Sequence, residues 1–87
     1  MKWTISFSRQ AKDFLGKQKV KEEVLGLIKN AILKFQGEIV SLDIKKMKGE
    51  WQNSYRIRKG KYRIIALFDF EKHFIHIEIV DWRGNIY

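Results

Sequence analysis

The sequence contains no cysteine, no proline and only two histidines among its 87 residues. Without cysteine, neither a disulfide nor a thiolate metal site can form. His73 and His76 alone do not make a convincing zinc site, so no metal ion and no other cofactor is expected. No apolar run approaches the roughly 20 residues of a membrane span, and the first residues lack the continuous apolar stretch of a signal peptide. A cytoplasmic protein is therefore expected.

Acidic residues are also few, because 10 Asp and Glu stand against 18 Lys and Arg, for a formal net charge of +8. Residues 42–63 hold eight of the basic residues and only two acids, which gives a local net charge of +6. Such a field attracts polyanions such as nucleic acid, an anionic membrane or an acidic protein partner. Lysines that serve only solubility are the alternative. The segment also contains Trp51, Tyr55 and Tyr62, whose rings are predicted to offer base-stacking surfaces among the cations.

The hydrophobic pattern predicts an α+β fold in a single domain that spans residues 1–87. Residues 2–7 alternate between polar and apolar side chains, as in a half-buried strand. Ser8 suits a helix N-cap, and the short helix that follows is expected to end at Gly16. A longer helix with an apolar stripe is predicted over 18–36. The two helices would form a helical hairpin that lies across one face of a sheet.

The C-terminal half is predicted to form a three-stranded antiparallel meander, which completes one sheet with the N-terminal strand. The middle strand is apolar on both faces and should be central. Lys59 and Gly60 are predicted to make a tight turn, since glycine adopts positive φ. Period-two alternation places Ile75, Ile77 and Ile79 on one face of the last strand. The three strands cover residues 53–58, 62–69 and 73–82.

Residues 38–52 show no clear periodicity, which indicates a loop with a short extended piece over 42–46. The apolar residues of this segment are expected to attach it to the core. Lys45, Lys46 and Lys48 are expected to project outward.

The remaining chemical groups suit metal-free phosphodiester chemistry, since the sequence shows no Ser-His-Asp arrangement, no P-loop and no credible carboxylate pair. Guanidinium groups bind phosphate through two hydrogen bonds and stabilise the charge of a pentacoordinate transition state. RNA supplies its own nucleophile, the 2′-hydroxyl. Arg56 and Arg58 share a strand face, and the tight turn brings Tyr62 or Arg63 beside Arg58. Three guanidinium groups are therefore expected at one hairpin, with a solvated strand face as the alternative.

The passages YRIRKGKYRII and IHIEIVDWRGNIY, together with the opening strand and the start of the helical hairpin, resemble the RelE/ParE toxin superfamily. The resemblance covers essentially the whole chain. It implies a bacterial or archaeal type II toxin that inhibits translation by cutting mRNA on the ribosome without a metal ion, with contacts to 16S rRNA. It also implies a cognate acidic antitoxin that wraps the toxin. Any contact with DNA is expected only through the antitoxin complex.

The resemblance also implies residue roles. Arg63 matches the arginine of the family's YR motif and would bind the scissile phosphate. Arg83 matches the arginine of the terminal motif and would stabilise transition-state charge or protonate the leaving group through a bound water. Tyr87 matches the terminal tyrosine, which would stack on the target base or serve as base. The implied RNA-binding residues are Arg56, Arg58, Lys45, Lys46 and Lys48.

The chain departs from the family pattern at its C-terminal end. Asp81 lies two residues before Arg83, where it can pair with that arginine and partly cancel its charge. The histidine that some relatives use as acid or base is absent from the terminal motif, and His73 and His76 are expected to be structural or exposed. Two alternatives stay open: a ParE-like inhibitor of DNA gyrase that cuts nothing, and a homologue that binds nucleic acid without activity.

Overall fold

The protein is represented by a computed structural model that describes residues 2–49 and 53–82. These residues form two helices and five strands, which confirms the predicted α+β class. Within them, no helix is both long and apolar enough to cross a membrane. The elements in chain order are β1 (Thr4–Phe7), α1 (Arg9–Gln18), α2 (Lys21–Phe35), β2 (Asp43–Lys46), β3 (Ser54–Lys59), β4 (Tyr62–Asp69) and β5 (Phe74–Trp82).

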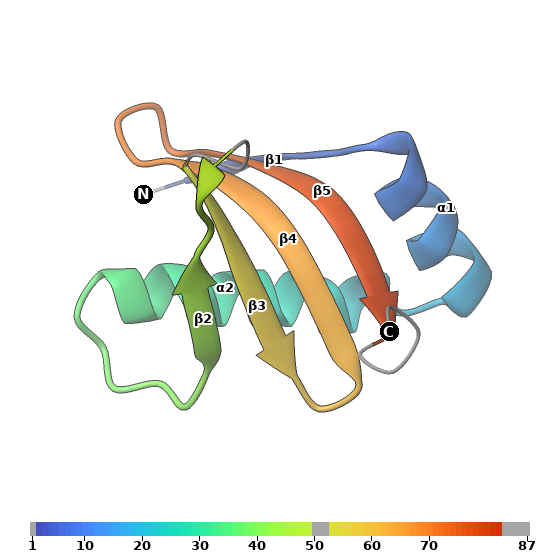
Figure 1. The fold of residues 1–87 in the computed structure, drawn as a ribbon, viewed down its shortest axis with the longest axis horizontal. Coiled ribbons are helices and arrows are strands. Elements are labelled where there is room, and N and C mark those ends of the chain that lie inside the picture. The colour runs from blue at the N-terminus through green and yellow to red at the C-terminus, as the bar shows by residue number, and fades with distance from the viewer. Residues whose placement is uncertain (1, 50–52, 83–87) are drawn as a thin grey trace.

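The strands form one mixed sheet in the order β1-β5-β4-β3-β2 (Figure 1). β1 runs parallel to β5, and the other neighbours are antiparallel. The extended piece predicted within a loop is the edge strand β2, whose Ile44 pairs with Ile57 of β3. The antiparallel part of the sheet therefore has one strand more than the predicted meander.

Ser8 caps α1, and its hydroxyl accepts a hydrogen bond from the backbone N–H of Ala11 at 3.1 Å, as its position predicted. The predicted end of this helix at Gly16 is wrong, because α1 continues to Gln18. The chain turns instead at Lys19, which has a φ of 56° and donates its backbone N–H to the carbonyl of Leu15.

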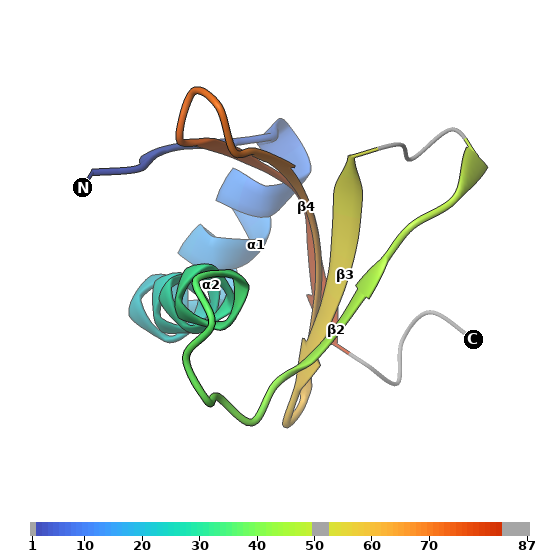
Figure 2. The same ribbon diagram turned by 90° about the vertical axis from the view of Figure 1, so that its left-hand side faces the viewer.

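Both helices lie on one side of the sheet, and α2 crosses behind the strands (Figures 1 and 2). Burial of apolar surface between the two layers is the main favourable term, at roughly 25 cal/mol per Å² removed from water. On the other side of the sheet, no helix or strand formed by residues 2–49 or 53–82 covers the strands (Figure 2). Fully buried side chains between helices and sheet include Ala11, Val24, Ile28, Ala31, Ile57, Ile64, Ile75, Ile77 and Val80.

A β-bulge changes which residues of β5 face the helices. Ile65 pairs with Ile79, but the next residue, Ala66, pairs with Ile77, so Glu78 is the extra residue. Ile77 is fully buried in the core between helices and sheet, whereas Ile79 is only half-buried and lies outside it. The prediction that Ile79 shares a face with Ile77 is therefore wrong.

The β3–β4 turn consists of Gly60 and Lys61, one residue later than predicted. Gly60 has a φ of +57°, which supports the assignment of glycine to this turn. The resulting register pairs Lys59 with Tyr62 and Arg58 with Arg63. Of the two neighbours predicted for Arg58, the structure therefore selects Arg63.

Candidate nucleic-acid interface

One side of the sheet faces away from both helices (Figure 2). By strand register, this side carries Lys45, Arg56, Arg58 and Arg63. Side chains alternate along a strand, so the neighbours of the buried Ile57 and Ile64 point to this side. We call this surface the basic face. Its positions on the described strands β2 to β5 include Asp43, Lys45, Ser54, Arg56, Arg58, Arg63, Ile65, Leu67, His76, Ile79 and Asp81.

One row of cross-strand partners crosses the basic face near the β3–β4 turn. Asp43 of β2 lies opposite Arg58 of β3. Arg58 lies opposite Arg63 of β4, which in turn lies opposite Asp81 of β5. Directly opposite residues are about 4.5–5.5 Å apart, so two guanidinium groups are carried side by side within reach of one phosphate. The cross-strand partner of Asp81 is Arg63. Arg83 lies outside the described residues, so the expected pairing of Asp81 with Arg83 stays a prediction.

Asp43 holds two of the arginines in place. Its Oδ2 accepts a hydrogen bond from Arg58 Nε at 3.0 Å, and its Oδ1 lies 3.9 Å from Arg56 Nη2. The Asp43 side chain is 49% exposed, so solvent screens these pairs and they add little to stability. Their main effect is to orient the two guanidinium groups, which outnumber the single carboxylate.

A second row of cross-strand partners on the basic face begins with charged residues on β2 and β3 and ends with apolar residues on β4 and β5. Lys45 lies opposite Arg56, Arg56 opposite Ile65, and Ile65 opposite Ile79. Ile65 is only 2% exposed although it lies outside the core between helices and sheet. Arg56 Nε is buried, and no group in the described residues accepts a hydrogen bond from it. An anion on this face would supply that acceptor.

Lys46 and Lys48 do not lie with the arginines. Lys46 pairs with Tyr55, so it alternates to the other side of the sheet at the exposed edge. Lys48 follows β2 and is also exposed, as predicted. A hollow of about 380 Å³ lies beside both lysines and is lined by Lys46, Met47, Lys48, Gly49 and Asn53. These lysines therefore form a second basic region next to the arginines.

The two tyrosines of this segment do not serve as stacking surfaces in the way the sequence predicted. Tyr55 faces the helices and packs edge-on against Phe35, with ring centroids 4.9 Å apart. Tyr62 is buried and stacks on Trp82 at 5.4 Å. Both rings pack against the helix side, because each lies two residues from a buried isoleucine on its own strand, Ile57 or Ile64, and so points the same way. Trp51 lies outside the described residues.

Tyr62 is also bonded to the neighbouring helix. Its hydroxyl donates to Glu23 Oε2 at 2.5 Å. Burial, and then the hydrogen bond and the negative charge of Glu23, raise the pKa of Tyr62 to about 12. This phenol therefore stays protonated near neutral pH and is unsuited to act as a base.

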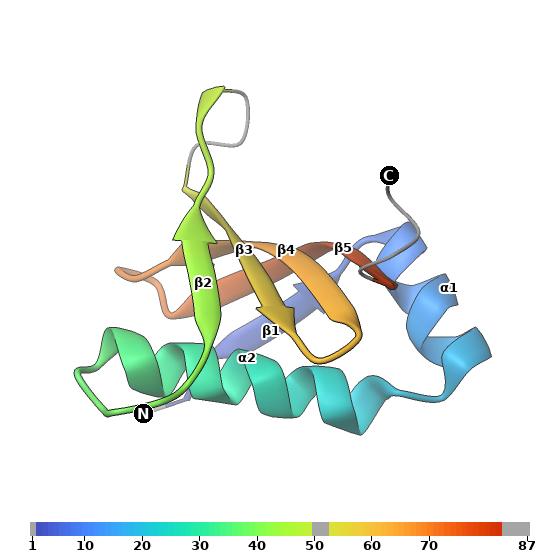
Figure 3. The ribbon, with the colours of Figure 1, turned by 60° about the horizontal axis from the view of Figure 1, so that its bottom comes forward.

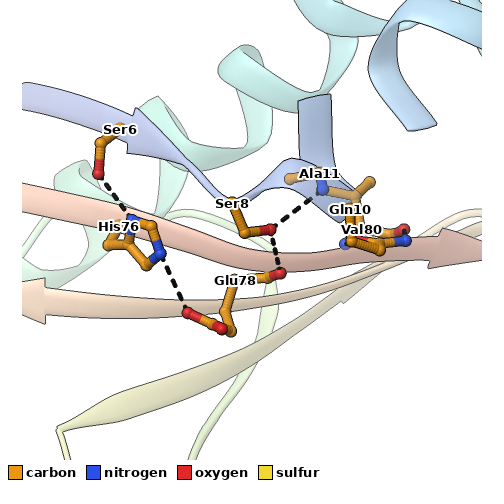
Figure 4. Close-up of polar contacts among 7 residues, drawn as sticks. All are labelled: Ser6, Ser8, Gln10, Ala11, His76, Glu78 and Val80. Atoms are coloured by element: carbon orange, nitrogen blue, oxygen red, sulfur yellow. Dashed lines mark hydrogen bonds and ion pairs between the residues drawn. The ribbon is translucent and has the colours of Figure 1, made fainter. Parts of the chain in front are cut away.

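The structure brings together a serine, a histidine and a glutamate that the sequence analysis did not connect (Figure 4). Ser6 Oγ lies 2.7 Å from His76 Nδ1, and His76 Nε2 lies 3.0 Å from Glu78 Oε2. Ser6 and His76 are 70 residues apart and meet only through the parallel pairing of β1 with β5. Both imidazole nitrogens are occupied, so the group acts as a cross-strand link. It supports the prediction that His76 is structural.

Side chains from the start of α1 hold the C-terminal half of β5 (Figure 4). Ser8 Oγ donates to the carbonyl of Glu78 at 2.6 Å. Gln10 donates to the carbonyl of Val80 at 2.8 Å and accepts from its N–H at 3.0 Å. Gln10 thus satisfies backbone groups that a longer β1 would have paired. These hydrogen bonds hold the bulged part of β5 in place. Asp81, which lies on the basic face, follows directly after it.

Comparison with solved structures gives long matches over nearly the whole chain. A chain of the archaeal RelE–RelB complex from Pyrococcus horikoshii OT3 is 22% identical, with a TM-score of 0.67 over 98% of this chain and 99% of that chain. A chain of the RelB–RelE complex from Methanococcus jannaschii is 27% identical, with a TM-score of 0.63 over 94% of each chain. The protein has a RelE-like toxin fold.

A chain of the YoeB–YefM complex from Staphylococcus aureus shares the RelE-like fold at 19% identity, with a TM-score of 0.61 over 95% of this chain and 99% of that chain. No protein-family model and no curated protein matches the sequence. The structures therefore support the resemblance to the RelE/ParE toxin superfamily that the motifs indicated.

Within the RelE-like fold, the predicted site residues fall into three groups. Arg56, Arg58 and Arg63 lie together on the basic face, with Lys45 beside them. Lys46 and Lys48 lie at the neighbouring edge. Arg83 and Tyr87 lie outside the described residues, so their predicted roles remain predictions.

Proposed function

We propose that this chain is the toxin of a type II toxin–antitoxin pair and acts as a metal-independent, ribosome-dependent mRNA endoribonuclease. The observation that carries the proposal is the side-by-side placement of Arg58 and Arg63 on a face of the sheet that no described element covers, in a RelE-like toxin fold. The buried Arg56 Nε without an acceptor supports an anionic ligand at this place. The RelE and YoeB names of the neighbours favour a nuclease over a gyrase inhibitor.

In the proposed mechanism, RNA lies across the basic face with its scissile phosphate on Arg63. The 2′-oxygen attacks the phosphorus atom and the bond to the 5′-oxygen breaks, which leaves a cyclic phosphate and a free 5′-hydroxyl. Arg58 and Arg56 hold the adjoining backbone, and Arg63 with Arg83 stabilises the extra charge of the transition state. Tyr87 stacks on the target base or accepts the 2′-proton. Lys45, Lys46 and Lys48 bind more distant mRNA or 16S rRNA.

The proposed partner is a cognate antitoxin with an acidic contact surface. Several neighbours were crystallised as complexes with RelB or YefM. A chain of net charge +8 attracts an acidic partner at long range, while buried apolar area supplies most of the affinity. Binding of such a partner over the basic face would exclude RNA from the arginines.

The proposal is tested by inducing the protein in cells and mapping transcript ends by primer extension. Wild type should arrest translation and give discrete cuts within translated codons. Arg63→Ala should reduce cleavage by about 100-fold or more, the scale seen when one transition-state donor is removed. Arg9→Ala, a loss of the same charge at an exposed position on α1, is the matched control and should cut like wild type.

Two outcomes would contradict the nuclease. Intact mRNA together with DNA-damage signalling would instead indicate a gyrase inhibitor. Undiminished cleavage by Arg63→Ala, with circular dichroism showing an unchanged fold, would remove the basic face from the mechanism.

A further inference from the structure

The backbone of β5 departs from regular strand geometry beside the start of α1. In a regular strand, the carbonyls of successive residues point to opposite edges. In β5, however, the carbonyls of Ile77 and Glu78 both accept hydrogen bonds from Ser8, the first from its backbone N–H at 2.9 Å and the second from its hydroxyl at 2.6 Å. Successive carbonyls that point to one edge are a consequence of the bulge at Glu78. Ser8 therefore holds the bulge directly.

Gln10 holds the strand again beyond the bulge. β1 ends at Phe7, and α1 begins beside the C-terminal half of β5 (Figure 3). Gln10 Nε2 donates to the carbonyl of Val80 at 2.8 Å, and Gln10 Oε1 accepts from the N–H of Val80 at 3.0 Å. One side-chain amide therefore supplies both hydrogen bonds at a point where strand pairing with β1 has ended.

The bulge decides which side chains of the last part of β5 lie on the basic face. With the bulge, Val80 points to the core and Asp81 lies on the basic face opposite Arg63. Without it, regular pairing continued from Ala66 and Ile77 would set Val80 opposite Arg63 and turn Asp81 to the helix side. A shift of one residue would therefore replace the carboxylate beside Arg63 with an apolar side chain.

Burial of apolar surface does not by itself choose between these two registers. Strict alternation would bury Ile79, which the bulge leaves half-buried outside the core. The bulged register instead places Val80 and Trp82 against the helices, where the rings of Trp82 and Phe14 lie 5.1 Å apart. The hydrogen bonds of Gln10 are specific to the bulged register, because only there do the backbone groups of Val80 point to α1.

We propose that Gln10 is a positioning residue for the nuclease, which holds β5 in the bulged register and so keeps Asp81 opposite Arg63. Gln10 acts through the backbone of Val80 and does not touch RNA. Val80 also lies three residues before Arg83, the predicted transition-state donor, so the same hydrogen bonds fix the strand from which the chain continues to that arginine. The effect on cleavage rests on the proposed function, whereas the effect on register does not.

A role in stability alone is the alternative, and the molecule offers a matched control for it. Ser6 also joins the start of the chain to β5, because its hydroxyl lies 2.7 Å from His76 Nδ1 across 70 residues. This contact lies before the bulge, where β1 and β5 pair regularly. Ser6→Ala therefore weakens the attachment of β5 without releasing its register beyond the bulge.

The first measurement is cleavage of mRNA on programmed ribosomes by wild type, Gln10→Met and Ser6→Ala. Methionine keeps the length of glutamine but lacks its amide, and Gln10 is exposed, so the variant should fold, which circular dichroism checks. Single-turnover rates at increasing protein concentration give a maximal rate and a half-saturating concentration. Gln10→Met should lower the maximal rate about tenfold or more, because small displacements of catalytic groups are costly. Its half-saturating concentration should stay within about twofold, since Arg56 and Arg58 still bind RNA.

The second measurement is amide hydrogen exchange by NMR, which reports the register without RNA. The N–H of Val80 points to Gln10, so the N–H of the next residue, Asp81, points to β4. It should exchange at least about tenfold faster in Gln10→Met than in wild type. The N–H of His76, before the bulge, should exchange at the same rate in both proteins. Ser6→Ala should match wild type in Asp81 exchange and in the maximal rate of cleavage.

The proposal would be overturned by wild-type exchange of Asp81 in Gln10→Met, by an unchanged maximal rate in that variant, or by an equal loss of rate in Ser6→Ala. Should Gln10→Met not fold, Gln10→Lys replaces it. Lysine can donate to the carbonyl of Val80 but cannot accept from its N–H, so both effects should keep their direction and be smaller. Failure of the nuclease proposal would appear as absent cleavage by wild type, and it leaves the exchange comparison unchanged.

Discussion

The two faces of the sheet are built from the same strands but depend on different interactions. Ile64 and Ile65 are neighbours on β4 and are 0% and 2% exposed. Ile64 packs between sheet and helices, whereas Ile65 lies outside that core, on the side of the sheet that carries Arg56 and Arg63. Alternate residues of one strand therefore belong to two separate surfaces, the core and the basic face. Each face is therefore open to change with little effect on the other.

The largest expected difference is in the free energy of unfolding. Ile64→Ala leaves a cavity between sheet and helices and should cost about 2–5 kcal/mol. Arg58→Ala removes an exposed pair with Asp43 and should cost at most about 1 kcal/mol. Urea unfolding followed by circular dichroism measures both. A cost for Arg58→Ala as large as that for Ile64→Ala would mean that the basic face is part of the structural core.

A smaller effect is expected where the hairpin meets α2. Tyr62→Phe removes the hydrogen bond to Glu23 and should cost about 1 kcal/mol at neutral pH. Because folding raises the pKa of Tyr62 from 10.0 to about 12, the phenol contributes its full stability below pH 10, and the contribution is lost as the pH rises towards 12. The wild type should therefore lose its advantage over Tyr62→Phe across this interval.

Urea titrations of wild type and Tyr62→Phe at pH 8, 10 and 11.5 test this dependence. The difference between their free energies of unfolding cancels the contribution of the other groups, which titrate in both proteins. A stability difference that stays constant with pH would show that Tyr62 does not titrate differently on folding.

The smallest expected effect is a gain in stability. Gly26→Ala and Gly16→Ala should each stabilise the protein by up to about 1 kcal/mol, since alanine favours a helix and neither Cβ meets another atom within 4 Å. Thermal unfolding measures the gain. Destabilisation by Gly26→Ala alone would mean that α2 packs more tightly against the hairpin than the structure shows.

The local features of the fold follow directly from the sequence. Period-two alternation gave the correct faces for Arg56, Ile57 and Arg58, and the glycine at position 60 gave a turn that brings Arg63 to Arg58. The apolar run of β4 correctly indicated a central strand. These predictions succeeded because each depends on residues close together in the chain. The roles given to Arg56, Arg58 and Arg63 stay predictions, and so do those of Arg83 and Tyr87.

Features that depend on distant pairing were not predictable. The extra residue Glu78 turns Ile79 to the opposite face of the sheet from Ile77, and strict alternation along the sequence does not reveal this bulge. Ser6 meets His76 only because β1 and β5 pair across 70 positions. The tyrosines were assigned to base stacking from composition, although Tyr55 alternates in step with Ile57 and Tyr62 with Ile64, which places both on the helix side. Composition identifies which groups are present, and register decides where they point.

The four-residue edge strand β2 has a consequence for the protein on its own. Edge strands offer unpaired backbone groups to other molecules, and flat apolar edges promote aggregation. Lys45 and Lys46 project to opposite sides of this edge, so a copy that added to it in register would set ammonium groups about 4.8 Å apart. Like charges at that spacing repel, so the two lysines disfavour the edge-to-edge addition of a second copy.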